Sequence, residues 1–294
     1  MSERESKKAA LVDASKVREF GFQVAGHPGV LEVEGDGMII KPQYQRELEF
    51  YEGSGSCPEL CSFMPTFYGS LEHAGETSQT DSSSGEPSPA KRYICLENLV
   101  HGFKEPCVVD VKIGVRLYDI DASPEKRERT IKQANRTTSG RLGIAITGMR
   151  VHGQPAVDRD WCRDLTPTTL VDAFEMYFSS AAQCISVEYR RQVIQQFVEE
   201  LKELNAAIER TETRMYSSSV FFIYEASKER YESLVAKDKG DSEDSSDDDD
   251  GGGALVNMKM IDFAHSHWTP GQGRDDNYIA GISKLVEIFG TLIE

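Results

Sequence analysis

The sequence predicts an α+β fold. Short strand-like segments come first in the chain, and a mixed region containing the long amphipathic helices follows. We see no internal repeat that would indicate a repeat architecture. A chain of 294 residues forms one or two domains and is long enough to bury a substantial hydrophobic core.

The first hundred residues contain most of the early strands. We expect a hairpin between the strands at residues 30–34 and 38–41, because Gly35-Asp36-Gly37 is typical of a tight turn. An amphipathic helix is expected at residues 43–52. Further strands are expected at residues 19–24, within 62–70 and at 92–96. Residues 72–91, rich in Ser, Thr, Gly, Glu and Pro, predict a disordered insertion.

The second part of the chain follows a connector at residues 97–105. Ser123 and Pro124 mark the start of a helix at residues 124–135, as N-cap and first-turn residue. Other helices are expected at residues 168–180, 182–210 and 277–292, and strands from residue 106 and at 142–152, 217–225 and 255–263. The acidic residues 237–253 predict a disordered, solvated loop.

An apolar strand at residues 106–114 contains one acid and one base two positions apart. Because side chains alternate along a strand, Asp110 and Lys112 share one face, while Val109, Val111 and Ile113 point to the other. Charged residues are seldom fully buried unless they are paired. The alternative to a functional role is an edge strand with a solvated polar face.

Two further patterns suit phosphate chemistry. Asp262 ends an apolar strand, where a carboxylate can hold Mg²⁺ against nucleotide phosphates; the alternative is a turn or cap residue. Lys41 ends another strand and Glu47 lies on the next helix, a pairing that can hold phosphates. The alternative for this pair is a surface ion pair of little energetic value.

The helix at residues 124–136 is basic in a chain whose net charge is −16. Lys126, Arg129 and Arg136 share a face with Gln133, and Lys132 lies beside it. Arginine and lysine side chains can hold several phosphates at once. A solvated basic face is the alternative. The acidic balance of the whole chain disfavours direct nucleic-acid binding.

Two motifs together resemble the inositol polyphosphate kinase family. They are Pro-x-x-x-Asp-x-Lys-x-Gly at residues 106–114 and Ile-Asp-Phe-Ala-His at residues 261–265. Shorter matching pieces occur in the family's order at residues 23–27, 40–42, 46–51, 96–99, 122–129 and 218–221. Within the family, the sequence looks most like the fungal multikinases.

The resemblance implies a two-lobed kinase-like fold. Residues 1–100 would form a small, antiparallel, β-rich nucleotide-binding lobe, and residues 101–294 a larger mixed α/β lobe for catalysis and substrate binding. It implies ATP and Mg²⁺ (magnesium) as cofactors. Backbone groups of Glu97 and Leu99 would meet adenine, and Asp110 would meet the ribose hydroxyls. With the resemblance, the nucleotide role of Lys41 is preferred.

The resemblance also implies the catalytic and substrate residues. Asp262 would be the metal ligand, and Lys112 would contact the substrate near the transferred phosphate; these two are the expected catalytic residues. Other expected substrate-binding residues are Lys126, Arg129, Lys132, Gln133, Arg136 and His265. His267 has no matched role and is expected to be a solvated loop histidine. Ser218 and Ser219 are interpreted as structural support beside Asp262.

The expected activity is ATP-dependent phosphorylation of inositol 1,4,5-trisphosphate and inositol tetrakisphosphate hydroxyls. The alternatives within the class are a trisphosphate 3-kinase and a hexakisphosphate kinase. The short segment between Gly114 and Leu142 favours a multikinase over a 3-kinase. An alternative of another class is a nuclear inositide-binding transcription scaffold with little catalysis.

Partners and location are expectations of the same kind. Expected partners are soluble inositol polyphosphates, phosphoinositide lipid headgroups, and nuclear transcription-factor partners recruited by the acidic loop. We expect a monomer. The scattered cysteines indicate reduced thiols, and the charged N-terminus lacks the apolar stretch of a signal peptide. We therefore expect the protein to be located in the nucleus and cytoplasm.

Overall fold

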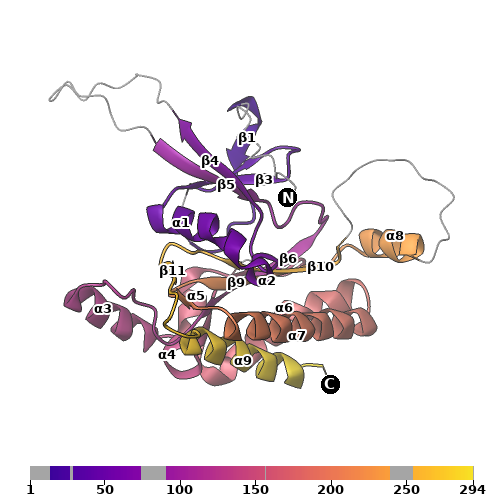
Figure 1. Cartoon of the computed structure of the whole chain (residues 1–294). Helices are drawn as coiled ribbons and strands as arrows, with labels where there is room; N and C mark the ends of the chain where they lie inside the picture. The colour runs from indigo at the N-terminus through magenta and orange to yellow at the C-terminus, as the bar shows by residue number, and fades with distance from the viewer. Residues whose placement is uncertain (1–13, 27–28, 74–90, 156, 239–253, 294) are drawn as a thin grey trace.

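The computed structural model describes residues 14–26, 29–73, 91–155, 157–238 and 254–293. Figure 1 shows a β-rich N-terminal part resting on a larger part in which a second sheet is covered by long helices. The α+β prediction is confirmed. Within the described residues, no helix is both long enough and apolar enough to span a membrane.

The N-terminal lobe is built on one antiparallel five-stranded sheet. Its strand order is β1 (Val17–Glu19), β2 (Leu31–Val33), β3 (Met38–Pro42), β5 (Lys91–Glu97) and β4 (Phe67–His73). Gly35 and Gly37 both adopt positive φ between β2 and β3, so the predicted hairpin turn is confirmed. The remaining elements of this lobe are η1 (Ala14–Lys16), α1 (Gln45–Gly53), η2 (Ser54–Ser56) and α2 (Pro58–Cys61).

The C-terminal lobe is built on an antiparallel four-stranded sheet. Its order is β10 (Val256–Ile261), β9 (Ser219–Glu225), β6 (Pro106–Ile113) and β7 (Ile144–Arg150). Helices α6 (Pro167–Cys184), α7 (Val187–Glu209) and α9 (Asp276–Thr291) lie together below this sheet (Figure 1). The other elements are α3 (Pro124–Ala134), α4 (Ser139–Leu142), α5 (Arg159–Asp164), β8 (Thr213–Met215), α8 (Lys228–Asp238) and β11 (Ser266–Trp268).

Aromatic packing joins the two lobes. The ring of Phe50 on α1 stacks on Phe263, which follows β10, and on Trp268 of β11, with centroids 4.7 and 4.8 Å apart. Phe50 and Phe263 are both fully buried or nearly so. Burial of these rings fixes α1 against the segment that follows β10.

Several expectations need correction. The strand expected at residues 19–24 is wrong, because β1 ends at Glu19 and residues 20–26 are irregular. Strand β6 pairs with both β7 and β9, which excludes the alternative of an edge strand for this segment. Helices α5 and α8 and the β8–β11 pair were not predicted.

The predicted lobe boundary between residues 100 and 101 falls in the connector that joins β5 to β6, and it stays a prediction. Most of the two predicted disordered segments, residues 74–90 and 239–253, lies outside the described residues. At their edges the prediction is wrong: residues 72, 73 and 91 belong to strands β4 and β5, and residues 237 and 238 end α8.

Candidate active site

Two pockets meet between the lobes and share one wall. The upper pocket, of about 100 Å³, is mainly apolar; the lower pocket, of about 860 Å³, is lined largely by polar and basic residues. The residues common to both pockets are Ala25, Gly26, Asp110 and Asp262. Two carboxylates therefore stand where the two compartments join.

Lys41 is held between two carboxylates in this junction. Its Nζ lies 2.8 Å from Oε1 of Glu47 and 2.6 Å from Oδ1 of Asp262. Burial by itself would lower the pKa of Lys41, but the negative charges of Asp262 and Glu47 raise it above its usual value. Lys41 is therefore a fixed cation at the floor of the upper pocket.

Asp262 occupies a strained backbone position directly after β10. Its φ is +65°, which non-glycine residues rarely adopt. The next residue, Phe263, is fully buried, and its N–H donates to Oε1 of Glu47 at 3.3 Å. Packing of Phe263 and this hydrogen bond hold the turn, so the Asp262 carboxylate is directed into the junction while remaining 31% exposed.

Asp110 and Lys112 share a face of β6, as the alternation predicted, and both line the lower pocket. Asp110 is buried, and Oγ1 of Thr147 donates to its Oδ1 at 2.7 Å. Burial, and then the nearby charge of Asp262, raise the pKa of Asp110. The Nζ of Lys112 donates to the carbonyl of Ser217 at 2.6 Å.

The connector residues Glu97 and Leu99 line the upper pocket, as expected for adenine-contacting groups. The Glu97 N–H donates to the carbonyl of Thr66 at 2.9 Å. The Leu99 carbonyl accepts a hydrogen bond from the side chain of Asn257 at 3.2 Å, so the connector is tied to strand β10. Whether their backbone groups meet adenine stays a prediction.

The basic helix α3 is divided between two environments. Ser123 caps it by accepting the N–H of Lys126 at 3.2 Å, as predicted. The side chains that line the lower pocket are Arg129, Lys132, Gln133 and Arg136. Lys126 is not among the pocket residues. It lies instead near His265, since its charge contributes to lowering the pKa of that histidine.

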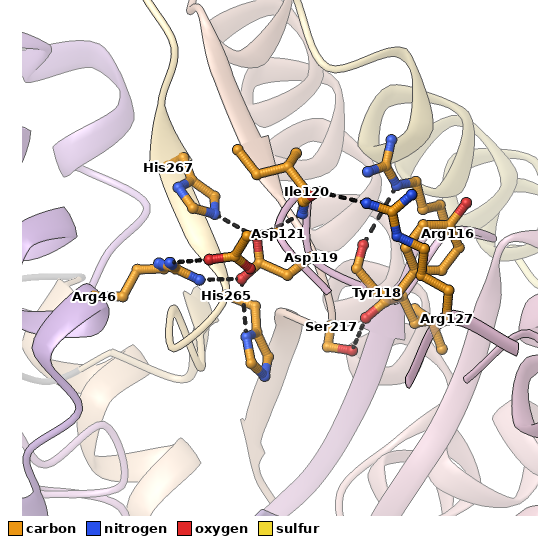
Figure 2. Close-up of polar contacts among 11 residues, drawn as sticks. Arg46, Arg116, Tyr118, Asp119, Ile120, Asp121, Arg127, Ser217, His265 and His267 are labelled. Carbon is orange, nitrogen blue, oxygen red and sulfur yellow. Dashed lines mark hydrogen bonds and ion pairs between the residues drawn. The ribbon is translucent and has the colours of Figure 1, made fainter. Parts of the chain in front are cut away.

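His265 and His267 both contact a buried carboxylate that sequence reasoning missed. Figure 2 shows Asp119 between the two imidazoles and Arg46. His267 is only 17% exposed and lies 2.7 Å from Asp119, so the expectation of a solvated loop histidine is wrong. The only sequence feature that could have indicated this site is the position of Asp119 between two large apolar side chains, Tyr118 and Ile120. That feature does not indicate which residues pair with Asp119.

Helix α5 supplies a second basic wall that was also missed. Its arginines Arg159 and Arg163, together with the acid Asp164, line the lower pocket. No helix was predicted from the sequence in this part of the chain. Nη2 of Arg159 donates to the carbonyl of Gly26 at 2.7 Å. The available signal was Asp158, which caps α5 by accepting the N–H of Trp161 at 2.8 Å.

The serines beside the junction are buried, as expected for structural support. Ser218 and Ser219 are at most 1% exposed, and Ser219 pairs with Ile261, the residue before Asp262. Among the described residues, the hydroxyls of Ser218 and Ser219 have no hydrogen-bond partner.

The junction suits a divalent cation that is shared with phosphates. Among the described residues, no group of three or more His, Cys, Asp or Glu side chains converges as a protein-only metal site. Asp262 nevertheless offers a partly exposed carboxylate beside a fixed lysine. Mg²⁺ typically takes one or two protein carboxylates and completes its shell with phosphate oxygens and water, which these residues fit.

Comparisons with known proteins agree with the motifs. A family model described as inositol polyphosphate kinase matches residues 93–290. The chain is 35% identical over 350 residues to the inositol polyphosphate multikinase of Saccharomyces cerevisiae, with 92% of this chain and 97% of that protein covered. It is 29% identical over 287 residues to the inositol polyphosphate multikinase of Schizosaccharomyces pombe, covering 95% and 99%.

Other similarities are to a human enzyme and to a solved structure. Human inositol hexakisphosphate kinase 2 is 32% identical over 227 residues, covering 69% of this chain and 52% of that protein. The crystal structure of the S. cerevisiae inositol phosphate multikinase Ipk2 in complex with ADP and Mn²⁺ aligns with a TM-score of 0.71 and 35% identity. That alignment covers 87% of this chain and 99% of the other.

Proposed function

This chain belongs to the inositol polyphosphate kinase family, and on that basis we propose that it is an ATP-dependent multikinase that phosphorylates inositol polyphosphate hydroxyls. The proposed substrates are inositol 1,4,5-trisphosphate and inositol tetrakisphosphate. Both similar fungal proteins are multikinases that match over nearly their whole length, whereas the human hexakisphosphate kinase matches over about half of its length.

One observation carries the proposal. The upper and lower pockets join at Asp110 and Asp262. An apolar compartment suits a base, and a basic compartment suits a polyphosphate, so a phosphoryl donor and an acceptor would meet at the shared wall. Phosphoryl transfer relies mainly on such positioning and on charge stabilisation.

Each residue has a proposed role in the transfer. Lys41, held by Glu47, offsets charge on the nucleotide phosphates, and Asp110 holds the ribose hydroxyls. Lys112 lies on the substrate side and stabilises charge on the transferred group. Asp262 would hold a divalent cation, which supplies further charge neutralisation when bound. Arg129 and its neighbours on α3 orient the inositol ring for in-line attack.

The proposal is tested by incubating the purified chain with ATP and Mg²⁺ and a panel of inositol phosphates of increasing phosphate number. Chromatography identifies the products. Conversion of the trisphosphate to a tetrakisphosphate and then a pentakisphosphate supports a multikinase. Arrest at the tetrakisphosphate would indicate a 3-kinase, and conversion of the hexakisphosphate alone would indicate a hexakisphosphate kinase.

We expect Lys112→Ala to lower kcat more than it raises the KM for ATP. The reason is that Lys112 lines the lower pocket and not the upper one. Steady-state kinetics with both substrates varied measure the two constants. A variant that loses only ATP affinity would contradict the position assigned to Lys112 on the substrate side.

A nuclear scaffold role is proposed in addition to catalysis. The acidic residues 241–250 lie outside the described residues and could recruit a basic transcription-factor surface. We also propose a monomer in the nucleus and cytoplasm, with phosphoinositide headgroups as further ligands of the basic pocket. The net charge of −16 argues against direct nucleic-acid binding.

Deletion of residues 241–250 separates the two roles. We expect turnover of soluble inositol phosphates to stay within about threefold of the intact chain, because the sequence predicts a solvated segment, whose charges salt would screen. Kinetic assays of the deletion variant provide the measurement. A loss of more than about tenfold would show that the segment belongs to the active site.

A further inference from the structure

A single buried carboxylate collects donors from two distant parts of the chain and from the residue that follows it. Asp119 is 1% exposed. Its Oδ1 lies 2.7 Å from Nε2 of His267 and also accepts the N–H of Ile120 at 2.7 Å. Its Oδ2 lies 3.1 Å from Nδ1 of His265 and pairs with Arg46 (Figure 2). Each carboxylate oxygen of Asp119 thus has two neighbouring donors, which compensate the buried negative charge.

This arrangement sets the protonation of His265. Burial would raise the pKa of Asp119, but hydrogen bonding to His267 and the charge of Arg46 outweigh it and lower that pKa, so the group is ionised and can only accept. Nδ1 of His265 must therefore carry the proton. Burial, and then the charge of Lys126, lower the pKa of His265, which leaves the ring neutral with a lone pair on Nε2.

The loop that carries Asp119 is braced against the substrate side of the site. Arg127 of α3 donates to the carbonyls of Ile120 and Ala122, each at 2.8 Å. Oγ of Ser217 donates to the carbonyl of Leu117 at 2.8 Å, and the carbonyl of the same serine accepts from Lys112. The position of the Asp119 loop is therefore linked to both α3 and Lys112.

Helix α1 links the same carboxylate to the nucleotide side. Arg46 pairs with Asp119, and the next residue, Glu47, holds Lys41 and the N–H of Phe263. Two successive residues of one helix, Arg46 and Glu47, therefore connect the Asp119 loop to the turn that presents Asp262. A shift of Asp119 would therefore be transmitted through α1 to the turn that presents Asp262.

We propose that Asp119 is a positioning residue for phosphoryl transfer: its buried carboxylate fixes His265, the Asp119 loop at residues 114–123 and helix α1 in one arrangement around Asp262. The proposal rests on the proposed kinase function for its kinetic consequences. Its structural consequence, the Nδ1–H form of His265, does not depend on activity.

The test compares Asp119→Asn with Asp121→Asn. Asp121 is a matched control, because its Oδ2 accepts from the other terminal nitrogen of Arg46 at 2.8 Å but the carboxylate is 61% exposed. The kinetic constants of the full-length chain are measured for inositol 1,4,5-trisphosphate and ATP at a temperature where both variants remain folded by circular dichroism.

We expect kcat of Asp119→Asn to fall about 100-fold, the cost of a misplacement of roughly 1 Å at a reacting centre. The KM for ATP should stay within about threefold, because Lys41 keeps its contact with Glu47. Asp121→Asn should stay within about threefold in all constants, as exposed pairs contribute little. If Asp119→Asn is as active as Asp121→Asn, the proposal is overturned.

A second readout needs no turnover. In ¹⁵N NMR of histidine-labelled wild-type protein, assigned with His265→Gln, His265 should be neutral with its proton on Nδ1. This signal should persist in Asp121→Asn and move toward the other tautomer in Asp119→Asn. A wild-type His265 protonated on Nε2 alone would overturn the proposal even if the kinase activity is present. An inactive wild type with the expected signal would instead count against the proposed function.

Discussion

Asp262→Asn is expected to lower turnover by at least about 1,000-fold, roughly 4 kcal/mol of transition-state stabilisation. The substitution removes the carboxylate charge at the wall shared by the two pockets, where a divalent cation would be held. The amide keeps the same shape, so inositol phosphate binding should be nearly unchanged. The measurements are steady-state kinetics with a Mg²⁺ titration and calorimetric binding of inositol 1,4,5-trisphosphate.

The fold should tolerate this change. Asn adopts positive φ more readily than most residues, and φ at this position is +65°. The melting temperature should therefore not fall by more than a few degrees. Asp276→Asn, which alters a 77% exposed carboxylate that lines neither pocket, is the matched control and should leave turnover unchanged. Near-normal turnover of Asp262→Asn with an unchanged Mg²⁺ requirement would refute the assignment.

The second large effect is expected in the basic lower pocket. The double change Arg129→Ala and Arg136→Ala should raise the KM for inositol phosphates by at least about 100-fold. Each charge-assisted phosphate contact contributes roughly 1.5–3 kcal/mol, about 10- to 150-fold in affinity. The KM for ATP should be almost unchanged, because neither arginine lines the upper pocket. The effect should increase with the number of substrate phosphates and decrease in high salt.

Arg141→Ala is the matched control for this prediction. Arg141 lies on the adjacent helix α4, is exposed, and does not line the lower pocket. Arg141→Ala removes one positive charge nearby, against two in the double variant, without removing a pocket contact. Equal KM values for inositol phosphates in the control and the double variant would mean that substrate binding depends only on the overall electrostatic field of this basic region, and not on contacts made by Arg129 and Arg136. Loss of ATP affinity in the double variant would show that the lower pocket is misassigned.

Features that depend on neighbouring residues could be predicted from the sequence. The turn at Gly35 and Gly37, the start of α3 at Ser123 and the shared face of Asp110 and Lys112 all follow from local backbone preferences and from side-chain alternation. The family followed from the order and spacing of two motifs. The first three features depend on a few neighbouring residues, and the family on the order of motifs along the chain, so no knowledge of the folded chain was needed.

The composition of the site was decided by the tertiary structure. Lys41 meets Asp262 across 221 positions, and Asp119 meets His267 across 148. Residues 20–26 are irregular, and Arg150 and Arg159, which lie far along the chain, donate to the carbonyls of Gly21 and Gly26.

Long-range packing also divided the basic helix: Arg129 lines the lower pocket, whereas Lys126 lies outside it and its charge helps to lower the pKa of His265. From the sequence pattern alone, all residues on one exposed face of a helix are predicted to have the same environment. Only the packing of α3 against the Asp119 loop makes its two ends different, because the partners that distinguish them lie far away in the chain.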